Sequence, residues 1–185
     1  MRLFSRPRPE PDHDPGHTEA IDFAWRAHNA QEAWTARVDT KASILLALEG
    51  GSLFAILSAN NQAGALRSLD GLPQVLEIIG ATVVFLSVFA SAAAVFPMLG
   101  SVSQHKRDHI NNAVYFGHVR HWHADDLGRY LMARDSVDSI ATLSTQLVAM
   151  SKRNWAKHRL VQASLLLAVL GVSLVALAVG LNTVM

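Results

Sequence analysis

Apolar residues gather in three long runs along this chain, at residues 42–60, 77–98 and 160–182. An α-helix rises 1.5 Å per residue, so about 20 apolar residues cross the roughly 30 Å hydrocarbon core of a bilayer. Each run is close to that length. The second run has one charged residue, Glu77 at its edge, and the third has none. The pattern therefore predicts an all-α membrane protein with three transmembrane helices.

Polar segments beside two of these runs also have a helical pattern. From residue 18 to the middle of the first run there is no proline or glycine, and apolar residues recur at helical spacing. We expect Thr18 to cap a helix over 18–41 that continues into the first span. Asp135 or Ser136 can cap a second helix that continues into the third span. The long helices are thus expected to extend into a helical cytoplasmic domain built from 18–41 and 99–159.

The remaining segments are short. Residues 1–17 hold four of the six prolines and several arginines, which predicts a disordered basic tail. Residues 61–76 are expected to form a short extracytoplasmic loop, and Pro97 to end the second span. Residues 183–185 are then an extracytoplasmic C-terminus.

Lysine and arginine are distributed very unevenly between the two sides of the predicted spans. Six precede or open the first span, nine lie between the second and third, and only Arg67 lies between the first and second. Positively charged loops stay in the cytoplasm. The chain is therefore predicted to be a multi-pass protein of the cell inner membrane, with its N-terminus inside and its C-terminus outside.

Charge and composition exclude several classes of function. The formal net charge is +1, so nothing indicates a nucleic acid polymer as partner. Cysteine is absent, which removes disulfides, thiolate metal sites and cysteine nucleophiles. No GxGxxG, Walker, GxSxG or HExxH motif occurs. We therefore expect no enzyme, no catalytic residue and no cofactor.

Glu49 is an acid in the middle of the first span. An ionisable group at that depth costs several kcal/mol unless it is neutral, paired or wet, and such groups are often functional. It can line a pore or a bundle axis in an oligomer. Alternatively it is a protonated Glu bonded to a hydroxyl of the second span, or it lies near the interface. The candidate hydroxyls belong to Thr82, Ser87 and Ser91.

Small residues recur at every fourth position of the first span, from Ser43 to Ala59. Such an edge allows a neighbouring helix to approach closely, which is how spans associate in lipid. Three spans with few polar residues make no transport pathway alone. We therefore expect a homo-oligomer in the lipid bilayer.

Histidines in the segment after the second span suggest a metal site. His105 and His109 are four residues apart, and three more lie between 118 and 123. Helical i,i+4 spacing can place two imidazoles on one metal. However, Arg107 and Arg120 lie beside them and would oppose a cation. We expect no metal, and histidines that are hydrogen-bonded or stacked on aromatic rings.

Basic and aromatic residues mix in the same segment. Arginine and lysine bind phosphate, and aromatic rings stack on bases. The candidate phosphate partners are Lys106, Arg107, Arg120 and Arg129, and the candidate stacking residues are Trp34, Tyr115 and Trp122. Asp39 and Lys41, where the chain enters the membrane, are candidate gate or hinge residues. They are equally well read as a structural ion pair or as helix anchors.

Three stretches in order resemble the transmembrane effectors of Pycsar antiphage systems. They are Val38-Asp-Thr-Lys-Ala42 entering the first span, Asn112-Ala-Val-Tyr-Phe-Gly-His118 after the second, and Gln146-Leu-Val-Ala-Met-Ser-Lys-Arg-Asn-Trp-Ala-Lys157 leading into the third. The resemblance covers roughly residues 20–180 and assigns no ligand-contact residue.

The resemblance implies an antiviral function in abortive infection. A neighbouring pyrimidine cyclase would make cyclic CMP (cCMP) or cyclic UMP (cUMP) during phage infection. The effector would sense that nucleotide and damage the inner membrane, which kills the infected cell. A rival interpretation is a structural or regulatory membrane subunit that binds a partner protein through helices within 104–158.

Overall fold

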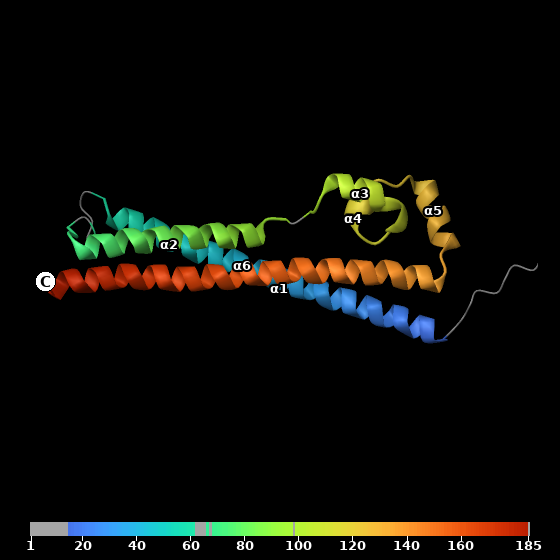
Figure 1. Cartoon of the computed structure of the whole chain (residues 1–185), viewed down its shortest axis with the longest axis horizontal. Coiled ribbons are helices and arrows are strands. Elements are labelled where there is room, and N and C mark those ends of the chain that lie inside the picture. Colours follow the sequence, from blue (N-terminus) through green and yellow to red (C-terminus); the bar gives the residue numbers. More distant parts are fainter. Residues whose placement is uncertain (1–14, 62–65, 67, 98, 185) are drawn as a thin grey trace, which may run out of the picture. The chain divides into compact units, whose positions relative to one another are not determined.

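The computed structural model describes residues 15–61, 66, 68–97 and 99–184, and the predicted tail at 1–17 falls largely outside them. Nearly all of the described residues are helical, and no strand occurs among them. Three helices are long and apolar enough to cross a membrane: α1 (Pro15–Ala59), α2 (Leu72–Val95) and α6 (Ser136–Val184). Figure 1 shows α1 and α6 as long uninterrupted helices. The predicted all-α class with three spans is confirmed.

The long helices begin and end close to the expected residues. α1 begins at Pro15, one turn before the expected cap Thr18. α2 begins at Leu72, earlier than the apolar run, because Pro73 suits the first turn of a helix; it ends at Val95, just before Pro97. Asp135 caps α6, since its Oδ1 accepts the backbone N–H of Asp138 at 2.8 Å.

Four short elements connect α2 to α6. They are α3 (Val102–Asp108), the 3₁₀ turn η1 (His109–Asn111), α4 (Phe116–Val119) and α5 (Ala124–Ala133). α1 and α6 each contribute to two compact units. One unit contains the described parts of 1–33 and 98–152, and the other contains 34–97 and 153–185.

The membrane unit, 34–97 and 153–185, buries small and polar side chains and exposes large apolar ones. Its buried positions include serines and a glycine pair, whereas Phe54, Phe89 and Leu166 are 73%, 59% and 72% exposed. A water-soluble protein would bury these large side chains. Their exposure is the arrangement expected of helices that face lipid, where the apolar face needs no protein cover.

Buried positions in this unit repeat every seven residues. On α6, Lys157, Ser164, Gly171 and Ala178 follow this repeat, and on α1, Ala42, Glu49 and Ile56 follow it. Asn154 and Val38 are buried as well, three and four residues before these series. On α2 they alternate by three and four residues from Pro73 to Ala94. This spacing is that of left-handed helix packing.

The backbones of α2 and α6 meet at Gly80 and Gly171. A Cβ on Gly80 would lie 2.8 Å from the carbonyl oxygen of Gly171, and one on Gly171 would lie 2.8 Å from that of Gly80. Only glycine permits this approach.

Most of the small-residue edge predicted on the first span faces away from this packing. Ser43, Ala47, Gly51 and Ala55 are exposed, whereas the last member, Ala59, packs against the buried cluster. The buried face of α1 is the one with Ala42 and Glu49. The polar and small residues of α2 and α6 decide which face packs, because Glu49 needs hydrogen-bond partners and finds them there.

Candidate functional site

Glu49 joins the three spans at one buried point. Glu49 is 3% exposed, and its Oε2 accepts the hydroxyl of Ser91 on α2 at 2.7 Å. Its Oε1 accepts the hydroxyl of Ser164 on α6. Both serines are fully buried. We call Glu49, Ser91 and Ser164 the carboxyl junction, and it supplies the partners that a polar group needs away from water.

The sequence predicted part of this junction. Ser91 was one of the three hydroxyls expected to bond Glu49, and Ser164 of the third span was missed. Ser164 is one of the two serines in the third run, so its hydroxyl was a further partner that the sequence offered.

A second polar contact joins α1 and α6 outside the junction. Lys157 donates to Oδ1 of Asp39, and the side chain of Lys157 is only 8% exposed. One turn earlier, Thr35 donates its hydroxyl to Oδ1 of Asn154. We call these four residues the polar clasp. Asp39 therefore has its ion pair with Lys157 on α6, whereas Lys41 is exposed on α1.

The clasp explains two of the stretches that carry the family resemblance. Asp39 belongs to the first stretch and Lys157 to the third, so the ion pair links them. The second stretch builds a turn in the other unit. There Oδ1 of Asn112 accepts the N–H groups of Val114 and Tyr115.

Tyr115 lies in a ring cluster directly after that turn. Its ring packs against His105, Phe116 and His118, and its hydroxyl donates to the carbonyl of Leu99 at 3.2 Å. A Cβ on Gly117 would lie 2.4 Å from this ring, so the position requires glycine.

The predicted phosphate partners lie on the surface of the same unit. Lys106, Arg107, Arg120 and Arg129 are all exposed. Arg129 pairs with Asp126 within α5, and Nε of Arg120 donates to Nε2 of His121 at 3.2 Å. The four cations lie on different elements, α3, the end of α4 and α5, and the structure does not bring them to one contact partner.

The predicted stacking residues differ in their surroundings. Trp122 packs against His109 and Tyr130, and its Nε1 donates to the carbonyl of His109 at 2.9 Å. Trp34 is 54% exposed on α1 and belongs to the membrane unit. Whether these residues and Tyr115 bind a base stays a prediction.

His121 has a shifted titration. Its partial burial, and then the charge of Arg120, lower its pKa from the ordinary 6.5. The bond from Arg120 has the same sense, because it needs an unprotonated Nε2. Because the folded-state pKa of His121 is the lower one, the unfolded chain binds a proton at a higher pH than the folded chain does. The folded state is therefore destabilised as pH falls from the unfolded pKa to the folded pKa.

The histidines stack on rings and on one another. His105 contacts His118, and His109 contacts His121. In the described ranges, no group of three or more His, Asp or Glu side chains is placed to hold a metal ion.

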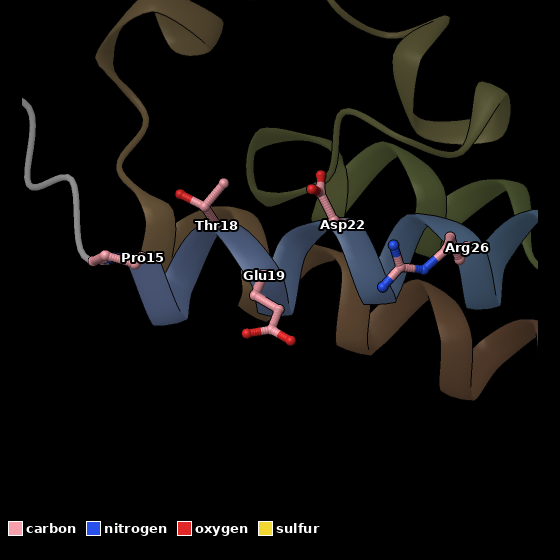
Figure 2. A pocket seen from close by; sticks show the side chains of 5 residues that line it. All are labelled: Pro15, Thr18, Glu19, Asp22 and Arg26. Carbon is pink, nitrogen blue, oxygen red and sulfur yellow. The ribbon is translucent and has the colours of Figure 1, made fainter.

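Among the described residues of the unit of 1–33 and 98–152 there are hollows at two places. The first lies along the start of α1 and is lined by Pro15, Thr18, Glu19, Asp22 and Arg26. Figure 2 shows Thr18 and Asp22 on one side of the helix and Glu19 on the other. Side chains of one helix that point apart do not converge on a ligand, so this hollow is a shallow surface.

The second hollow is larger and has walls from several elements. Its volume is about 600 Å³, within the range of small-molecule sites. It is lined by Asp108, Asn111, Asn112, His118, Tyr130, Asp138, Ala141, Thr142 and Thr145. We call it the polar hollow.

Comparison with known proteins identifies the family. The family model of the Pycsar effector protein domain matches residues 23–184, which is most of the chain. No curated protein and no solved structure matches the chain.

Proposed function

The chain belongs to the Pycsar effector family, and from this premise we propose a membrane effector of antiphage defence that is gated by cCMP or cUMP. The family match over residues 23–184 is the observation that carries the proposal. A pyrimidine cyclase acts as the functional partner that makes the signal. The effector itself catalyses no reaction, and its output is loss of inner-membrane integrity and death of the infected cell.

The continuity of α1 and α6 supports coupling between nucleotide binding and the spans. Each helix has residues in both compact units, so the same continuous helix takes part in nucleotide binding and in the membrane. A ligand moves such an equilibrium only by binding the two states with different affinity. The nucleotide therefore binds the unit of 1–33 and 98–152. Its exposed cations Lys106, Arg107, Arg120 and Arg129 attract the phosphate.

The polar clasp and the carboxyl junction are the proposed gate. Both hold α1 against α6 through polar contacts. Such contacts can be exchanged for water when the spans move apart, whereas packed apolar contacts cannot. Asp39 serves as the hinge contact, Lys41 anchors α1 at the membrane surface, and Glu49 turns toward the lesion when the junction opens.

Several copies act together in this proposal. Large apolar side chains and the small-residue edge of α1 remain uncovered in one chain. Three spans are too few to enclose a water-filled path. Association of copies into a homo-oligomer supplies the missing surface.

Binding is tested with the full chain in detergent. Titration calorimetry with cCMP and with cUMP is expected to show binding of at least one, and cyclic AMP serves as the control nucleotide. Absence of binding by both pyrimidine nucleotides at millimolar concentration would contradict the proposed sensing.

The junction is tested in cells that express the matching cyclase. We expect Glu49→Gln and Glu49→Ala to change toxicity and dye uptake, because both remove the acid that the opened spans would expose. Glu32→Gln is the matched control, since Glu32 is an exposed acid of α1 outside the spans. Unchanged killing by both Glu49 variants would remove this residue from the gate.

A further inference from the structure

The polar hollow has a lining of unusual chemistry for a site that serves an anionic ligand. Two carboxylates, Asp108 and Asp138, lie among its residues, and the residues lining it include no lysine or arginine. Two asparagines and two threonines add neutral polar groups. A phosphate placed against these carboxylates would be repelled. A neutral ring with amino groups could instead donate hydrogen bonds to these carboxylates.

The guanidinium of Arg134 lies beside the hollow. Nη2 of Arg134 donates to the hydroxyl of Thr142 at 2.7 Å and to the carbonyl of Asp138 at 2.5 Å. Its guanidinium carbon is 5.1 Å from the centre of the Tyr130 ring. Thr142, Asp138 and Tyr130 all line the hollow. Arg134 is thus held at its border by three lining residues.

Arg134 also has donor capacity left over. A guanidinium has five N–H groups, and the two bonds above use Nη2 only. Its Nε is buried and has no hydrogen-bond partner in the described part of the chain. A buried donor without a partner is costly, and an anion at the border would relieve that cost.

We infer that the polar hollow receives the base of the cyclic nucleotide, and that its carboxylates select cytosine over uracil. The inference rests on the proposed function and chooses between the two nucleotides that it leaves open. Cytosine presents an amino group, which donates to a carboxylate, at the position where uracil presents a carbonyl oxygen. Asp108 or Asp138 accepts from that amino group. The same carboxylate faces the uracil oxygen as acceptor against acceptor, which costs affinity.

The phosphate then lies at the border, near Arg134. Lys106 and Arg107 directly precede Asp108 in the chain, so two predicted phosphate partners adjoin a lining residue. Trp122 packs against Tyr130 of the lining. The base occupies the carboxylate side, and the charged group stays with the cations.

The location also gives binding a route to the third span. Asp138, Ala141, Thr142 and Thr145 belong to the first three turns of α6, and Asn112 and His118 belong to the second resemblance stretch. A base between them ties the segment after α2 to the start of α6. That helix continues without a break to Val184.

The test compares cCMP and cUMP on the full chain in detergent. The wild type is expected to bind cCMP at least about tenfold more tightly than cUMP, the size of one well-placed base contact. Asp108→Asn and Asp138→Asn each replace a carboxylate, which only accepts hydrogen bonds, with an amide that has one acceptor oxygen and one donor NH2 group. At least one of them should lower cCMP affinity about tenfold and raise cUMP affinity. Asp125→Asn is the control, since Asp125 is exposed on α5 and does not line the hollow.

Each outcome has one meaning when the variants unfold at the wild-type temperature. Equal or tighter binding of cUMP by the wild type overturns cytosine selection. Selective binding that both hollow variants leave at the level of Asp125→Asn overturns the location. Binding of neither nucleotide to the wild type overturns the proposed function itself. If one variant unfolds early, Thr145→Val tests the same wall and should weaken cCMP binding.

Discussion

Lys157 depends on its ion pair more than Asp39 does. The side chain of Lys157 is 8% exposed and that of Asp39 is 41% exposed. Removing the partner of a buried charge leaves that charge without compensation, whereas a half-exposed carboxylate can be hydrated. The two halves of the pair should therefore differ when each is removed alone.

We predict that Asp39→Asn lowers the free energy of unfolding by about 3 kcal/mol, and that Lys157→Met lowers it by less. The exchanged pair, Asp39→Lys with Lys157→Asp, should recover part of the loss. Thermal unfolding in detergent measures which of the two single variants loses more stability. Arg37→Gln is the control, since Arg37 is exposed on the same helix. A larger loss for Lys157→Met than for Asp39→Asn would show that the lysine is not the dependent partner.

Residue chemistry was predictable only where the chain itself limits the choices. Glu49 in an apolar run needed a hydroxyl, and Ser91 was within the expected set. The pairing of Asp39 could not be read in the same way. Lys41 and Lys157 are both cations near the membrane boundary, and only the packed face of α1 decides between them. The border position of Arg134 has no signal in the sequence.

At the scale of elements, long helices follow from the apolar runs and from the lack of helix breakers beside them. Their inward faces follow from different residues. The small-residue edge of α1 was a plausible packing face, yet the structure packs the face with Glu49, because an unpaired acid is costlier in lipid than an exposed alanine. The spacing and length of the apolar runs therefore predict that a span exists, and its polar residues determine which face packs against the other spans.

Two glycine-to-alanine changes on α6 should have opposite effects on stability, because one glycine lies at the contact with α2 and the other does not. Gly171→Ala puts a methyl group 2.8 Å from the backbone of α2, so the helices must separate and stability should fall by about 1–3 kcal/mol. Gly180→Ala meets nothing within 4 Å and should stabilise α6 by about 0.5–1 kcal/mol, as alanine does in helices. Thermal unfolding in detergent measures both. A loss of equal size in both variants would mean that the contact does not hold the spans together.

At the scale of the whole molecule, function depends on which side of the membrane the unit of 1–33 and 98–152 faces. A nucleotide made in the cytoplasm cannot reach that unit across the bilayer. Fifteen of the sixteen lysines and arginines lie in residues 1–41 and 99–159, and the last four of them belong to the first half of α6. If all three long apolar helices span the membrane, the two ends of the chain are expected on opposite sides. Sensing of the nucleotide therefore requires that this unit faces the cytoplasm.

A reporter fused after Met185 should consequently be active only outside the cytoplasm, and one fused before Met1 only inside. Alkaline phosphatase and green fluorescent protein distinguish the two compartments, because each is active in one of them. Replacing Lys152, Arg153 and Arg159 with glutamine should raise the fraction of reversed chains, since these cations lie just before the third span. Replacing Gln62 and Gln74 with asparagine changes no charge and should leave the orientation unaltered. A cytoplasmic reporter at Met185 would put the nucleotide and its site on opposite sides of the membrane, and no gating by the cyclase product could then occur.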